Sequence, residues 1–400
     1  MNDHAAIMQW IDEQQPLMLD LLVNWSNLNT YTFNLDGINQ FADKIADTFS
    51  HLTDNIERIP AEDYEYVDEK GNVRKKILAP ALMLSKRLDA PQKGLFVIHL
   101  DTVYPPEESI QTKIDKDKGV LQGQGVVDAK GGIVVMLKAL EAFERSPVAK
   151  NLGWRVVLNT DEEIGSPGSA DFLQKYAKES DIGFVFEPCM ANGNLIGSRK
   201  GSGNFAIASH GKSAHAGRAP HLGKNAIEPL MKCLLEIGQL NGSREKIIVN
   251  VAMINGGSAL NIVPDRAVGR FNVRVENSND QKFIEEELIR IVSKYENLKL
   301  YGKFQSPPRI IKGKTLKIYE KIRDSAHELG MKIDIGATGG VSDSNRMEAA
   351  GLSTIDSLGV QGDHLHSPDE YMEIKSLTER TKLVTLSLLQ WASGEWNSFL

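Results

Sequence analysis

The feature that most constrains the fold is a series of short, unbroken apolar runs. The runs LFVIHLD (95–101), WRVVLNTDEE (154–163) and IGFVFEP (182–188) are separated by loops and by a helix-like stretch, GGIVVMLKALEAFER (131–145). Strands that are apolar on both faces are typical of a parallel sheet with helices on each side. The sequence therefore predicts an α/β domain with a mostly parallel sheet.

A different pattern occupies the segment between about residue 200 and residue 305. Half-buried alternation in NFAIASHG, KIIVNVAMING and AVGRFNVRVEN is interleaved with helical spacing near 223–240 and 279–296. This order favours an inserted α+β domain, a four-stranded antiparallel sheet with two helices. We therefore expect a discontinuous larger domain, 1–199 and 306–400, interrupted by a domain at 200–305.

Helical spacing also runs through the first fifty residues. It predicts two surface helices, whose apolar positions are Ile7, Ile11, Leu17, Leu21 and Leu22 in the first and Ile38, Phe41, Ile45 and Phe49 in the second.

Charge and cysteine content exclude several classes of protein. The formal charge of −7, from 46 basic and 53 acidic residues, argues against a nucleic-acid partner. No apolar run reaches the roughly 20 residues of a membrane span, and the N-terminus lacks the pattern of a signal peptide. We expect a cytoplasmic protein without a membrane partner. Its two cysteines, Cys189 and Cys233, are too few for a disulfide framework or a four-sulfur zinc site.

Polar residues follow the predicted strands. Ligands of open α/β sheets bind beyond the carboxyl ends of the strands. Taken singly, each of these residues except those in HLD has an ordinary structural explanation, such as turn chemistry or a helix N-terminus. Taken together, five segments are expected to bring His or carboxylate to one crevice. The residues are His99, Asp101, Asp128, Asp161, Glu162, Glu163, Glu187, His364 and His366.

Imidazoles and carboxylates without thiolates suit a pair of divalent ions, zinc above all, with cobalt or manganese as competitors. Two ions about 3.5–4 Å apart need a ligand that bridges them, and a carboxylate can do so. A further carboxylate must stay off the metals to move the proton of the attacking water.

The ordered motifs HLDTV, GQGVVDAKGG, NTDEEIGSPGS, FEP and HSPDEY resemble those of the co-catalytic zinc aminoacylase/carboxypeptidase family. That family includes glutamate carboxypeptidase, acetylornithine deacetylase, succinyl-diaminopimelate desuccinylase and tripeptidase T. The resemblance extends from about residue 95 to the C-terminus and is strongest to members like glutamate carboxypeptidase. It implies a hydrolase that cleaves an amide bond next to a carboxylate.

The resemblance also implies a role for each polar residue. His99 and Glu187 would bind one metal, Glu163 and His366 the other, and Asp128 would bridge them. Asp101 would orient the His99 imidazole, and Glu162 would be the general base. The family ligand is the His directly before Ser, which selects His366 over His364. A cis peptide bond is expected between Asp128 and Ala129.

The inserted segment resembles the family's lid and dimerisation domain, which implies a homodimer. In SHGKSAHAGRAP, His215 would reach the neighbouring subunit's active site and polarise the scissile carbonyl. Asn261 and Arg274 occupy positions that the family uses for the substrate's carbonyl or carboxylate. Ser306 stands where glutamate-specific members carry Arg; either Arg309 takes over that role, or the acidic group of the substrate differs. TGGVSDSN resembles the family's substrate-side glycine loop, and its presence favours a substrate that carries a carboxylate.

Two classes of function remain open on the sequence. The first is a dinuclear metallohydrolase, either a carboxypeptidase or dipeptidase, or an N-acyl amino acid deacylase. The second is a catalytically silent relative that binds an amino-acid derivative. Because all five expected ligands and the base are present, the sequence favours the enzyme.

Overall fold

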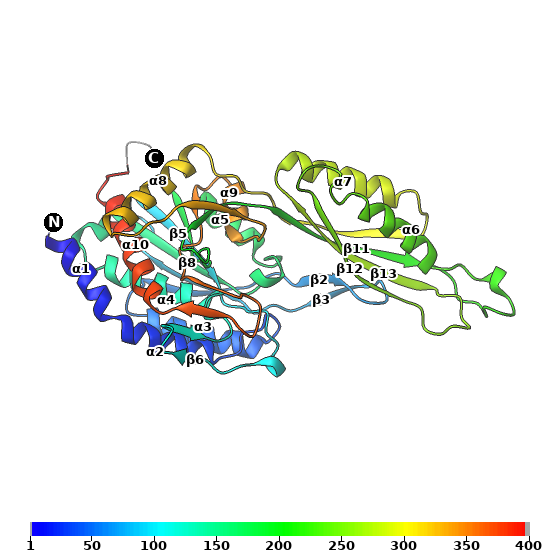
Figure 1. Ribbon diagram of the computed structural model, residues 1–400, viewed down its shortest axis with the longest axis horizontal. Coiled ribbons are helices and arrows are strands. Elements are labelled where there is room, and N and C mark those ends of the chain that lie inside the picture. Colours follow the sequence, from blue (N-terminus) through cyan, green and yellow to red (C-terminus); the bar gives the residue numbers. More distant parts are fainter. Residues whose placement is uncertain (1, 397–400) are drawn as a thin grey trace.

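The computed structural model describes residues 2–396 and contains a large α/β body and a smaller one beside it (Figure 1). The central sheet has the order β1-β4-β8-β5-β9-β16. Strand β5 pairs in parallel with both β8 and β9, and β16 pairs in parallel with β9. Strand β4 runs antiparallel to both of its neighbours, β1 and β8. The bounds are β1 (Asn55–Ile59), β4 (Ala81–Lys86), β5 (Gln92–His99), β8 (Leu152–Asn159), β9 (Ile182–Val185) and β16 (Thr354–Ile355). The expected mostly parallel sheet is confirmed.

Helices cover both faces of this sheet, as strands that are apolar on both sides require. On one face, α4 (Lys130–Phe143) is buried along almost its whole length and packs against α10 (Lys375–Ala392). The same core takes in α1 (Asn2–Glu13), α2 (Gln15–Ser26), α3 (Leu35–Phe49) and α8 (Gly313–Glu328). On the opposite face lie α5 (Ala170–Lys178) and α9 (Asp343–Ala349), where Leu173 and Met347 pack against strand residues.

The N-terminal segment forms three helices where we expected two. Pro16 stands in the first turn of α2, where its fixed φ suits a helix start, so α1 ends at Glu13 and a new helix begins. This break shifts the apolar stripe: Met18 and Leu22 are fully buried, whereas Leu17 is 48% exposed.

The inserted sheet consists of four antiparallel strands in the order β12-β13-β11-β14, confirming the expected α+β arrangement. The chain enters it at β11 (Gly201–His210), continues through β12 (Ile248–Gly256) and β13 (Arg266–Val275), and leaves at β14 (Leu298–Ser306). Helices α6 (Ile227–Gly238) and α7 (Ser278–Val292) lie side by side on one face and share its apolar core (Figure 1).

The opposite face of the inserted sheet meets a hairpin of the large body, β2 (Tyr64–Val67) and β3 (Val73–Lys76) (Figure 1). Val67 packs there against Ala208 and Val268. Arg270 of β13 donates a hydrogen bond of 2.8 Å to the Val67 carbonyl oxygen. The two bodies are therefore in contact away from the connecting strands as well.

Smaller sheets bring distant segments together. The order β17-β18-β7-β6 places β17 (Gly362–Asp363) and β18 (Tyr371–Glu373) beside β7 (Val120–Gln122) and β6 (Lys113–Asp115). A parallel pair joins β10 (Leu195–Arg199) to β15 (Ile335–Thr338). Within the described part of the chain, every helix is too short or too polar to span a bilayer.

Candidate metal centre

The candidate ligands meet where the neighbouring strands β5, β8 and β9 end. His99 is the last residue of β5 and pairs with Asn159 at the end of β8. Glu162 and Glu163 begin the short 3-10 turn η3 (Glu162–Ile164) just beyond β8, and Glu187 follows β9 by two residues. Since these strands are parallel neighbours, their carboxyl ends share one edge of the sheet, as expected.

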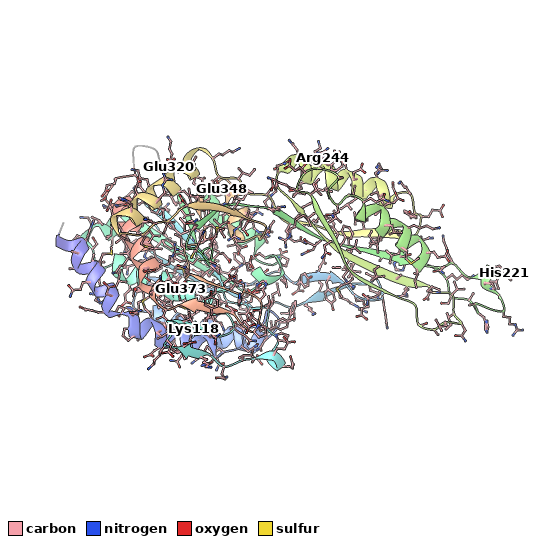
Figure 2. All side chains as sticks on the ribbon, viewed as in Figure 1. Lys118, His221, Arg244, Glu320, Glu348 and Glu373 are labelled. Carbon is pink, nitrogen blue, oxygen red and sulfur yellow. The ribbon has the colours of Figure 1, made fainter. Side chains whose placement is uncertain are left out.

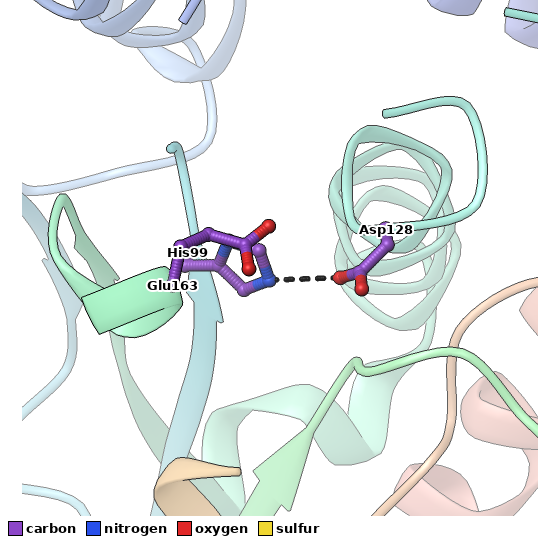
Figure 3. A group of neighbouring side chains, drawn as sticks. All are labelled: His99, Asp128 and Glu163. Carbon is purple, nitrogen blue, oxygen red and sulfur yellow. Dashed lines mark hydrogen bonds and ion pairs between the residues drawn. The ribbon is translucent and has the colours of Figure 1, made fainter. Parts of the chain in front are cut away.

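Asp128 lies between the two candidate histidine ligands. Its Oδ1 is 3.0 Å from His99 Nε2 (Figure 3), and its Oδ2 is 3.3 Å from His366 Nε2. Glu187 Oε1 is 3.7 Å from His99 Nε2, and Glu163 Oε2 is 3.2 Å from His366 Nε2. Asp128 thus lies between two pairs of side chains, His99 with Glu187 and His366 with Glu163. We call these pairs the first and the second half-site. The peptide bond from Asp128 to Ala129 is cis, as expected.

The electrostatics of this cluster call for positive charge. Burial raises the pKa of Glu187 to about 8 and that of Glu163 to about 7. Hydrogen bonds to Asp128 and Glu163 raise the pKa of His366 to about 11. Glu163 Oε1 is buried and has no hydrogen-bond partner. Divalent cations between these side chains would offset the crowding of buried carboxylates, so this donor set fits metal ions.

The tautomer of His99 also suits a ligand. Its Nδ1 lies 2.8 Å from the backbone carbonyl oxygen of Asp101, which can only accept, so Nδ1 carries a proton and donates it. In the neutral ring, Nε2 is then left with a lone pair that faces Asp128 and Glu187. Fixing a ligand imidazole in this way is characteristic of metal sites.

The Asp101 carboxylate contacts more than the imidazole that we expected it to orient. Its Oδ1 lies 3.4 Å from His99 Nδ1 and accepts from the backbone N–H of Glu162 at 3.2 Å. Its Oδ2 accepts from the backbone N–H of Glu163 at 3.3 Å and from Thr32 Oγ1 at 2.8 Å. Asp101 therefore also holds the turn that carries the expected base. The sequence analysis missed Thr32 because no motif around it indicates that its hydroxyl is buried and contacts Asp101.

The charges of Glu162 and Arg274 interact across the two bodies. Glu162 offers an oxygen within 4.8 Å of ligand atoms of His99 and Glu187. Burial lowers the pKa of Arg274, whereas the neighbouring charge of Glu162 raises it. The guanidinium donates to Asn272 Oδ1 at 2.9 Å, and its Nη1 lies 3.5 Å from the carbonyl oxygen of Gly339 in the glycine loop.

Arg309 does not reach the crevice. It is 1% exposed and donates to the carbonyl oxygens of Ile196 and Thr354 and to the Tyr319 hydroxyl. Because these contacts hold the guanidinium in the interior, the substrate-binding role that we expected for Arg309 is wrong. It is a structural residue beneath β10 and β16.

His215 and Asn261 are brought together with each other, but not with the metal ligands of the same chain. The Ala216 N–H donates to the Asn261 carbonyl oxygen at 2.9 Å, and His215 pairs with Ile262. Both lie on loops of the smaller body, and His221 of the same loop is at its far tip (Figure 2). His364 is also outside the cluster, with its ring edge against Tyr371.

Comparisons with known proteins agree with this fold. The sequence model of Peptidase family M20/M25/M40 matches residues 95–390. Carboxypeptidase G2 of Pseudomonas sp. (strain RS-16) is 25% identical over 397 residues, which cover 98% of this chain and 93% of that protein. A probable succinyl-diaminopimelate desuccinylase of Staphylococcus epidermidis is 26% identical over 245 residues, covering 54% of this chain and 58% of that protein.

Solved structures have the same fold at lower identity. The M20 family metallo-carboxypeptidase Sso-CP2 of Sulfolobus solfataricus superimposes with a TM-score of 0.73 at 15% identity, covering 94% of this chain and 99% of that one. Human carnosine dipeptidase 1 gives a TM-score of 0.68 at 15% identity, covering 98% and 100%. Since the family model spans most of the chain, this protein belongs to Peptidase family M20/M25/M40, a family of metal-dependent hydrolases.

Proposed function

We propose that the protein is a dinuclear metallohydrolase that cleaves the amide bond next to a free carboxylate in small peptides, as a carboxypeptidase or dipeptidase does. The observation that carries this proposal is the position of Asp128, whose two carboxylate oxygens face two different imidazoles. One carboxylate shared in this way is what a pair of adjacent cations requires.

Two divalent ions are assigned to the two half-sites. His99 and Glu187 would hold one, Glu163 and His366 the other, with Asp128 between them. Zinc is the proposed ion, with cobalt or manganese as alternatives, because the donors are imidazole nitrogens and carboxylate oxygens without sulfur. When bound, the ions would supply a strong positive charge that polarises the amide carbonyl and acidifies an attacking water.

The chain's own groups would move the proton and hold the substrate. Glu162 lies within reach of the first half-site, and burial beside Glu187 raises its pKa well above the ordinary value, as suits a base that takes a proton and returns it to the leaving amine. Asp101 would fix the turn that presents it. Arg274, beside Glu162 and the glycine loop, would bind the substrate carboxylate in a bidentate manner.

We propose further that residues 200–305 act as a lid and mediate a homodimer. Large apolar side chains lie exposed on adjacent elements of this segment, α6 and the sheet edge β12; they are Met231, Leu235, Ile248, Met253 and Ile254. An unpaired strand edge with apolar neighbours is a surface that a second copy can extend. His215 and Asn261 would then enter the crevice of the partner subunit. Light scattering should report a dimer, and Leu235→Glu should weaken it.

The substrate test is a screen of dipeptides and N-acyl amino acids with acidic and neutral C-terminal residues, in the presence of added zinc, cobalt or manganese. We expect release of the C-terminal amino acid, loss of activity with a chelator, and recovery when metal returns. Preference for N-acyl amino acids would favour the deacylase alternative. The absence of amide hydrolysis under all three metals would contradict the proposal.

A further inference from the structure

Glu370 is a buried carboxylate that the proposed mechanism does not use. It lies four residues after His366 in HSPDEY, directly before β18. Its exposed fraction is 0%, whereas Asp369 beside it is exposed. A charged side chain is almost never fully buried unless its hydrogen-bonding capacity is met.

Four hydrogen-bond donors converge on this carboxylate. Oε1 accepts from the backbone N–H groups of Val127 at 2.9 Å and Asp128 at 3.1 Å. Oε2 accepts from the backbone N–H of Gly125 at 3.0 Å and from the Tyr104 hydroxyl at 2.8 Å. The three backbone N–H groups can only donate, whereas the Tyr104 hydroxyl also lies 3.1 Å from the Ser367 carbonyl oxygen and can donate or accept. The three backbone N–H donors therefore hold both oxygens of the Glu370 side chain against this turn.

The donors come from the segment that presents the bridging ligand. Gly125, Val127 and Asp128 form the turn before α4, about 240 residues away from Glu370 in the sequence. Backbone bonds join the same two segments: the Gly123 N–H donates to the Glu370 carbonyl oxygen at 3.0 Å, and Tyr371 pairs with Gln122. Glu370 is the charged side chain at this junction.

We propose that Glu370 is a positioning residue that holds the Asp128 turn and the His366 segment at the separation the metal pair requires. The inference rests on the proposed function, because it assigns Glu370 to the spacing of two metal ligands. Asp128 is fixed at its own backbone N–H by Glu370, and His366 is only four residues along the chain from the same carboxylate. A shift at Glu370 therefore changes the distance between Asp128 Oδ2 and His366 Nε2, now 3.3 Å.

The test is Glu370→Gln, which keeps the shape but replaces one acceptor oxygen by an NH₂ group. That group faces either two backbone N–H groups or the Gly125 N–H and the Tyr104 hydroxyl, so at least one donor loses its partner. Asp369→Asn is the matched control, because it removes the same charge one residue away on an exposed side chain.

Three readouts separate positioning from general destabilisation: zinc affinity by chelator competition, the visible absorption spectrum of the cobalt-substituted protein, and unfolding of the metal-free protein. Loss of a residue that supports a ligand typically lowers metal affinity 10–100-fold. We expect a loss of this size and an altered cobalt spectrum in Glu370→Gln, with wild-type behaviour in Asp369→Asn.

Wild-type affinity and an unchanged cobalt spectrum in Glu370→Gln would overturn the inference, even if the metal-free protein unfolded more easily. If that variant does not fold, Tyr104→Phe decides, since it removes one donor and leaves the charge. An altered cobalt spectrum in Tyr104→Phe supports the inference, and an unchanged one counts against it. Failure of the wild-type protein to bind zinc or cobalt would instead refute the proposed function.

Discussion

Replacing Glu162 by Gln should have opposite effects on turnover and on the stability of the metal-free protein. The side chain is enclosed among other carboxylates, and burial together with Glu187 raises its pKa well above the ordinary value. At pH above the ordinary carboxyl pKa, Glu162 therefore opposes folding of the metal-free chain. A neutral amide of the same shape removes that opposition.

The magnitudes follow from this environment. Each pKa unit between the folded and unfolded states corresponds to about 1.4 kcal/mol, so Glu162→Gln should stabilise the metal-free protein by about that amount or more at alkaline pH. A positioned general base typically contributes 10²–10⁴-fold to rate, or about 2.7–5.4 kcal/mol of transition-state stabilisation. We expect kcat to fall by this factor while the bound metal content stays at the wild-type value.

The assay combines urea unfolding in the presence of a chelator, elemental analysis, and steady-state kinetics on whichever substrate the screen identifies. Glu69→Gln serves as the control for the charge change, because Glu69 is exposed and remote in the sequence from the cluster. Wild-type kcat in Glu162→Gln would remove Glu162 as the base. Loss of one of two metal ions would show instead that Glu162 is a metal ligand. Its position near His99 and Glu187 is compatible with that alternative role.

Other perturbations test the surrounding groups. Asp101→Asn should lower metal affinity and kcat 10–100-fold, measured by chelator competition and kinetics, because its carboxylate holds both His99 and the η3 turn; wild-type values would refute that role. Arg274→Ala should raise KM far more than it lowers kcat, because it removes the proposed contact to the substrate carboxylate. Arg309→Ala should lower the free energy of unfolding in urea by about 3–5 kcal/mol, because its buried partners lose their positive charge and their hydrogen bonds. Metal-free protein should lose stability as pH rises from 6 to 9. The folded-state pKa values of Glu163 (about 7) and Glu187 (about 8) lie above 4.5, so the folded chain binds more protons than the unfolded chain across this window. Urea midpoints that rise with pH would contradict this.

Much of the candidate metal centre could be predicted from the sequence because the positions of its residues follow from the strand pattern. Apolar runs that end in His99, in the DEE triplet or in Glu187 are parallel neighbours, so their polar ends have to meet. Asp128 could be predicted as a site residue because it stands in a glycine-rich turn before a helix. These relations depend on local pattern and on one rule of sheet topology.

Long-range packing could not be predicted in the same way. The sequence places Arg309 three residues after Ser306, as a candidate to replace a missing Arg, but contacts with β10 and α8 hold it in the interior. Glu370 was overlooked because an acidic residue in a turn is ordinary, and its partners lie about 240 residues earlier in the chain. In each case the role of the residue depends on contacts with segments far away in the sequence, which the spacing of nearby residues does not predict.

The most direct test of a dinuclear centre is anomalous diffraction at the zinc absorption edge from crystals of the zinc-loaded protein. We predict two peaks per chain, one beside His99 and Glu187 and the other beside Glu163 and His366, with the Asp128 carboxylate between them. A single peak, or two peaks that do not share Asp128, would contradict the account.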